Sequence, residues 1–97
     1  MEKDYEIQIL IENFTSFKNK INNYKHPEEL FGDLSGKLKD DKLESLKLKF
    51  RQLLKDYSAD KYSRFNDNDL FNISSNISRK IIELEEIAEK QILNNKY

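Results

Sequence analysis

The sequence predicts an all-α fold, a small helical bundle in which an antiparallel helical hairpin carries an extra N-terminal amphipathic helix. Only two Gly and one Pro occur among 97 residues, so few positions interrupt a helix. Three segments repeat apolar residues every three or four positions, which is the period of a helix facing a core. We expect an N-terminal helix within residues 1–25, a helical domain over 27–93 and a frayed tail over 94–97.

Composition narrows the classes of function. The chain has 17 basic and 18 acidic residues, and this balance gives no reason to expect a nucleic-acid partner. Cysteine is absent, which removes disulfides, thiolate metal sites and thiol nucleophiles. The longest apolar run is the triplet 9–11, far shorter than the roughly 20 residues of a membrane span. We therefore expect a cytoplasmic protein without a membrane span, metal or cofactor.

The first helix is predicted over residues 4–24. Its apolar residues follow steps of three and four: Ile7, Leu10, Phe14, Phe17, Ile21 and Tyr24. Such a stripe is typical of packing against the rest of a domain. The same spacing also suits a seam for a partner helix, so a dimer or hetero-complex through 4–24 stays open. The pair His26-Pro27 should end this helix, because a residue before proline avoids the helical region.

A short second helix should begin at Pro27, with Glu28 and Glu29 in its first turn, and stop near Gly36. After a polar loop over 37–40, Asp40 or Asp41 is expected to cap a third helix that runs to about Tyr57. The apolar face of this third helix holds Leu43, Leu46, Phe50, Leu53, Leu54 and Tyr57. Its opposite face carries Lys42, Lys47, Lys49, Arg51 and Lys55.

A polar loop is predicted over 58–69, followed by a final helix from about Asp69. The cluster Asp67-Asn68-Asp69 is better explained as a helix cap than as a calcium loop, since the glycine and the terminal glutamate of an EF-hand are missing. The final helix has an apolar stripe of Leu70, Ile73, Ile77, Ile81, Leu84, Ala88 and Ile92. Its length of about 25 residues leaves open a break near Glu85 that would make it two helices.

The central part of the chain resembles the J domain of Hsp70 co-chaperones. In that family a first helix holds an aromatic, an acidic and an aliphatic residue and then a glycine, matched here by Phe31, Asp33, Leu34 and Gly36. The second helix of the family runs to an aromatic-Arg pair, a Leu and a Tyr before the sequence His-Pro-Asp and a Lys. This chain has Leu46, Phe50-Arg51, Leu53, Tyr57 and then Ser58-Ala59-Asp60-Lys61. The resemblance covers residues 29–92.

The departures from the family concern its functional signature. In J domains the His-Pro-Asp corner engages the Hsp70 nucleotide-binding domain and promotes ATP hydrolysis; here His and Pro are replaced by Ser58 and Ala59. A small-residue position of the family is Lys49. The resemblance therefore implies a degenerate J-like subunit that docks on an Hsp70 or on a true J protein without stimulating ATP hydrolysis. It assigns partner binding to Lys47, Lys49, Arg51, Lys55, Ser58, Asp60 and Lys61.

Other functions compete with this interpretation. No catalytic constellation is expected, because the sole histidine, His26, sits beside a proline at a helix boundary and the chain's serines have no partner histidine. The alternative is a small helical-bundle binder or inhibitor, such as a bacteriocin-immunity protein or a phage-encoded antagonist, that blocks a protein partner. Proteins of that kind are also short and helical, so the fold class alone does not separate the two hypotheses.

Overall fold

The computed structural model describes residues 2–34 and 38–97, and the backbone in these ranges is helical without a strand. The all-α prediction is therefore confirmed. The elements follow in this order: α1 (Glu2–Asn22), α2 (Glu28–Phe31), α3 (Lys39–Tyr57), the 3₁₀ helix η1 (Ala59–Phe65) and α4 (Asn68–Leu93). The final helix is unbroken, so the break near Glu85 that the sequence left open does not occur.

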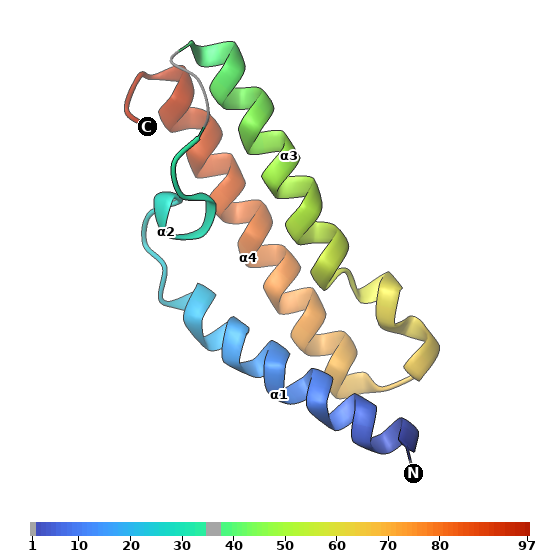
Figure 1. Ribbon diagram of the computed structural model, residues 1–97. Coiled ribbons are helices and arrows are strands. Elements are labelled where there is room, and N and C mark those ends of the chain that lie inside the picture. The colour runs from blue at the N-terminus through green and yellow to red at the C-terminus, as the bar shows by residue number, and fades with distance from the viewer. Residues whose placement is uncertain (1, 35–37) are drawn as a thin grey trace.

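Helix α4 is the centre of the molecule (Figure 1). Helices α3 and α4 form an antiparallel hairpin, and α1 lies along the N-terminal half of α4 on another side. The short α2 lies beside the middle of the hairpin, and the C-terminus lies near the end of the hairpin where α4 ends. The molecule measures 51 × 22 × 16 Å, and its radius of gyration of 15.2 Å exceeds the roughly 12–13 Å of a compact domain of this length. Its elongated shape follows from the length of α4.

The core is built mainly on one stripe of α4. Six apolar residues of the predicted stripe are almost fully buried, namely Leu70, Ile77, Ile81, Leu84, Ala88 and Ile92. Helix α1 contributes Phe14 and Ile21, with the rest of its stripe partly buried against the same core. The α1 stripe is thus used inside the chain, as expected for core packing. In α3, Leu46 is fully buried and Phe50 only partly, so Leu46 is the central contact of the hairpin.

An aromatic cluster joins α1 to the end of α3 and to η1. The rings of Phe17 and Tyr57 stack with centroids 4.4 Å apart, and Phe14 packs against Tyr57 and Tyr62 at 5.1 and 5.0 Å. The Tyr62 hydroxyl donates a hydrogen bond to the Asp56 carbonyl at 2.8 Å. Burial raises the pKa of the Tyr57 hydroxyl. These contacts fix the point at which the chain leaves α3, and that point is the corner between the hairpin helices.

The short α2 differs from its prediction at its end. It stops at Phe31, and the cap is Gly32, whose φ of 64° suits a residue without a Cβ. The predicted stop, Gly36, lies outside the described residues. At the other end, the Glu29 carboxylate accepts hydrogen bonds from the backbone amides of Lys25 and His26 at 2.6 and 3.0 Å. These hydrogen bonds lower the pKa of Glu29.

For the N-terminal caps of the two hairpin helices, α3 and α4, one prediction is wrong and one is confirmed. Helix α3 begins at Lys39 after Leu38, so neither Asp40 nor Asp41 is its cap; both lie in its first turn. Helix α4 is capped by Asp67, whose carboxylate accepts a hydrogen bond from the Leu70 amide at 2.9 Å. The difference arises because an acidic residue stabilises a helix start either as a cap or within the first turn.

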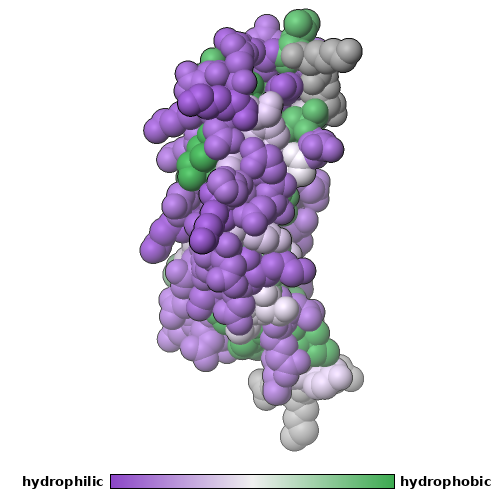
Figure 2. Space-filling view, turned by 90° about the vertical axis from the view of Figure 1, so that its left-hand side faces the viewer, coloured by the Kyte–Doolittle hydropathy of each residue, from purple (hydrophilic) through white to green (hydrophobic). Residues whose placement is uncertain are grey.

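The surface is strongly polar on the face shown in Figure 2, where hydrophobic residues appear only in small separate patches. None of the helices in the described ranges has the length and hydrophobicity needed to cross a membrane.

Candidate protein-interaction surface

A row of basic side chains lies on the outer face of α3. Lys47, Arg51 and Lys55 are exposed and recur every four residues, so they lie along one side of the helix. None of the three takes part in an ion pair among the described residues. We call Lys47, Arg51 and Lys55 the basic row. Leu48, with 62% of its surface exposed, lies on the same side of α3.

Lys49 has a different position from the basic row, although the sequence placed it in the same partner-binding set. Its ammonium group donates hydrogen bonds to the backbone carbonyls of Phe31 and Asp33, at 2.8 and 2.9 Å. It therefore ties the end of α2 to the middle of α3. Lys49 stays a predicted docking residue, but its exposed ammonium group already has two partners within the chain.

The C-terminal residue, Tyr97, forms further hydrogen bonds with the end of α2 and with α3. The Tyr97 hydroxyl donates to the Gly32 carbonyl at 2.6 Å, and the Tyr97 carbonyl accepts a hydrogen bond from Lys42 at 3.1 Å. Burial, together with the nearby acidic Glu28 and Asp33, raises the pKa of Tyr97 to about 12. The predicted fraying over 94–97 does not describe Tyr97, which is partly buried against the core.

The corner after α3 is helical where the sequence predicted a loop. Ser58 has an extended backbone, with φ −66° and ψ 133°, and η1 starts at the next residue. The Lys61 amide donates to the Ser58 carbonyl at 3.2 Å, and the Ser63 hydroxyl donates to the Asp60 carbonyl at 2.9 Å. These bonds leave the side chains of Asp60 and Lys61 exposed. We call residues 58–61 the corner.

The corner forms one wall of a shallow hollow of about 360 Å³. Residues 58–60 lie on one side, and Ser75, Ser78, Arg79 and Ile82 of α4 lie on the other. The Ser78 hydroxyl donates to the Tyr57 carbonyl at 3.1 Å, so it satisfies a carbonyl at the end of α3 and joins the two walls. The sequence prediction missed these α4 residues, because it followed only the buried stripe of the final helix.

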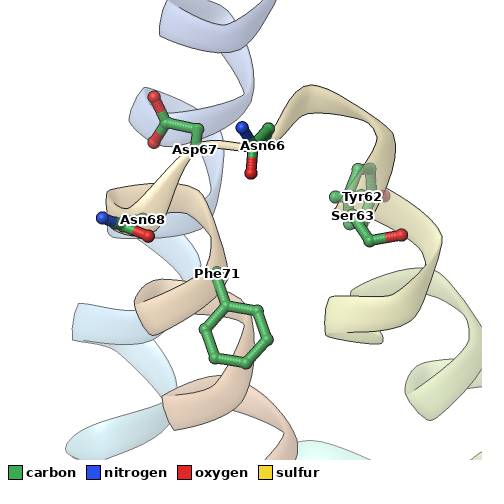
Figure 3. Close-up of a pocket in the computed structure, with 6 residues that line it drawn as sticks. All are labelled: Tyr62, Ser63, Asn66, Asp67, Asn68 and Phe71. Carbon is green, nitrogen blue, oxygen red and sulfur yellow. The ribbon is translucent and has the colours of Figure 1, made fainter.

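A smaller hollow of about 150 Å³ lies at the start of α4, under η1. Figure 3 shows Phe71 of α4 on one side of it, Tyr62 and Ser63 of η1 on the other, and Asn66, Asp67 and Asn68 at the turn between them. Phe71 leaves 53% of its surface exposed. The two hollows thus follow the line along which η1 meets α4.

Possible metal-ligating side chains are spread out in the described part of the chain. No three His, Cys, Asp or Glu side chains there are grouped so that they could hold a metal ion. His26 is exposed at the turn before α2. The described residues instead place exposed charges beside shallow hollows.

No family model, curated protein or solved structure matches this chain.

Proposed function

We propose that the protein is a non-catalytic protein-interaction module, a degenerate J-like subunit that docks on an Hsp70 or on a true J protein without stimulating ATP hydrolysis. The observation that carries the proposal is that exposed charges follow one another along α3 and into the corner after it. The basic row runs along α3 toward the corner, where Asp60 and Lys61 are exposed.

Charge supports α3 as the docking helix. Lys47, Arg51 and Lys55 form no direct ion pair among the described residues, although Glu85 lies near Lys47, so an acidic partner surface would meet charges that are not fully neutralised. Complementary charge of this kind accelerates and orients association, and salt weakens it. Lys49 remains in the proposed docking set, with a smaller expected contribution because its ammonium group already donates to the Phe31 and Asp33 carbonyls.

The backbone of the corner has a conformation that the His-Pro-Asp sequence of J domains can adopt. Ser58 has the extended conformation that a residue preceding proline prefers. Ala59 is the first residue of η1, and proline is tolerated at the first position of a helix. Replacing Ser58 and Ala59 by His and Pro should therefore leave the fold intact.

The decisive experiment measures ATP hydrolysis by the Hsp70 of the same host in the presence of three proteins. These are the wild-type chain, the double variant Ser58→His/Ala59→Pro, and that double variant with Asp60→Asn. We expect no stimulation by the wild type, stimulation by the double variant and its loss in the triple variant. If the folded double variant stimulates no more than the wild type, the J-like docking mode is wrong.

A binding measurement tests the surface itself. Charge reversal at Lys47 or Lys55 should weaken binding to the Hsp70 or J protein at least tenfold and reduce its salt dependence. Lys20→Glu is the matched control, since Lys20 is an exposed lysine on α1. Equal binding by all three variants would remove α3 from the site. A non-chaperone partner recovered from the host, with no ATPase effect, would favour the binder or inhibitor hypothesis.

A further inference from the structure

Three large apolar side chains of α4 remain exposed, and they lie on one line. Phe71, Ile82 and Leu93 leave 53%, 41% and 50% of their surfaces exposed. They are spaced eleven residues apart, and eleven residues make about three turns of an α-helix. The three side chains therefore follow one another along one side of α4, over about 33 Å. This line lies apart from the buried stripe that contacts α1 and α3.

Each of the three side chains borders a hollow. Phe71 lines the hollow under η1, which is shown in Figure 3. Ile82 lines the hollow beside the corner, and Leu93 lines a third hollow of about 330 Å³ together with Glu86, Glu89 and Lys90. The line thus combines exposed apolar groups with space beside them to receive apolar groups from another helix.

The polar residues along the line divide by their position. Between Phe71 and Ile82 lie two hydroxyl groups and a cation, Ser75, Ser78 and Arg79. Between Ile82 and Leu93 the line carries the carboxylates of Glu86 and Glu89, with the cation Lys90 beside them. Arg79 forms no ion pair within the described residues. The half before Ile82 therefore has a cation and no carboxylate, whereas the half after Ile82 has two carboxylates and one cation.

This division makes the line complementary to itself when two copies run in opposite directions. If Ile82 faces Ile82 of a second copy, the equal spacing puts Phe71 opposite Leu93. The same register puts Glu86 of one copy beside Ser78 and Arg79 of the other, and Glu89 opposite Ser75. An antiparallel pair of identical helices related by a two-fold axis requires this kind of self-complementary surface.

We propose that α4 is the interface of an antiparallel homodimer, centred on Ile82 and stabilised by the Arg79 and Glu86 charges of opposite copies. The occupant of the exposed line is thus a second copy of this chain. The interface is separate from the α1 stripe through which the sequence left a dimer open, since that stripe packs inside the chain. It does not depend on the chaperone-related function proposed above, although Arg79 and Ile82 lie across a hollow from the corner, which that function uses together with the basic row of α3.

The absence of cysteine allows the register to be tested by cross-linking. Ile82→Cys would place two thiols at the two-fold axis, so mild oxidation should give a covalent dimer rapidly. Leu48→Cys is the control, because Leu48 is an apolar residue of α3 that is even more exposed than Ile82, at 62% against 41%. A mixture of Ser75→Cys and Glu89→Cys should cross-link between the two variants faster than within either one. Cross-linking at position 48 as fast as at position 82 would overturn the proposal.

Sedimentation equilibrium tests the affinity and the charge pair. We expect a wild-type dimer whose dissociation constant rises at least tenfold in Ile82→Asp and in Arg79→Glu. The double variant Arg79→Glu/Glu86→Arg should recover most of the affinity, since it exchanges the charges across the interface. Because these three side chains are exposed, each variant should keep the circular dichroism of the wild type. A wild-type monomer at high concentration, or an Ile82→Asp dimer of unchanged affinity, would overturn the proposal.

Discussion

The hydrogen bonds from Lys49 of α3 to the end of α2 give the sharpest test of the structure. Replacing Lys49 should lower the free energy of unfolding, whereas replacing Lys47 on the same helix should not. Lys49 donates hydrogen bonds of 2.8 and 2.9 Å to the Phe31 and Asp33 carbonyls, whereas Lys47 has no such partner among the described residues. Hydrogen bonds from charged groups contribute about 1.5–3 kcal/mol each when they are shielded from water. Lys49 is exposed, so water replaces part of this energy. We expect Lys49→Ala to lower the free energy of unfolding by about 1–2 kcal/mol.

Lys47→Ala is the matched control, with an expected change within about 0.5 kcal/mol. Both substitutions make the same change in helix propensity. The difference between their free energies of unfolding therefore measures the contribution of the Lys49 hydrogen bonds to α2. The measurement is urea denaturation followed by circular dichroism. Lys49→Met adds a second comparison, since it keeps the apolar stem and removes only the charge. Equal stabilities of Lys49→Ala and Lys47→Ala would show that the two carbonyl contacts do not stabilise the fold.

Three further predictions concern the core, a cap and the C-terminus. Leu46→Ala should cost about 3–5 kcal/mol in thermal or urea denaturation, whereas Leu48→Ala on the exposed side should cost under about 0.5 kcal/mol. Asp67→Ala should cost about 1 kcal/mol in the same measurement, because the Leu70 amide loses its cap. The pKa of Tyr97 is raised from 10.0 to about 12, so its contribution to stability is fully present below pH 10 and falls as the pH rises toward 12. The stability of Tyr97→Phe should decrease less than that of the wild type across this pH range.

The long helices could be predicted from the sequence because they are held by periodic apolar residues. Phe14 and Ile21 on α1, and Leu70 through Ile92 on α4, recur at helical spacing and are buried in the structure. The Asp67 cap was also predictable, since an acidic or amide side chain before an apolar run satisfies free backbone amides. These features depend on local sequence alone.

Features that depend on contacts between distant residues were missed. Nothing near Lys49 or Tyr97 in the sequence indicates that both side chains reach the carbonyls of residues 31–33. The η1 helix was missed for another reason. Its inward residues, Tyr62 and Phe65, are three apart, which is the period of a 3₁₀ helix rather than that of an α-helix or a strand. A search for spacing of three between the helices would have found them.

The exposed part of the candidate surface was partly predictable. The basic row was visible as lysine and arginine residues opposite the apolar face of α3. The exposed line of α4 was equally present in the sequence, as Phe71, Ile82 and Leu93 outside the core stripe. It was overlooked because those three residues are too far apart to stand out until the orientation of the helix is known.

The central position of α4 also has a consequence for the order of folding. Helices α3 and α4 are close in sequence, so their contact closes a short loop. Helix α1 is separated from α4 by α2, α3 and η1, so its contact with α4 closes a much longer loop. Closing the longer loop costs more chain entropy and slows the search. We therefore expect the hairpin to form first and α1 to dock on it late. In native-state hydrogen exchange, the amides of α1 should open at lower free energy than those in the middle of α4.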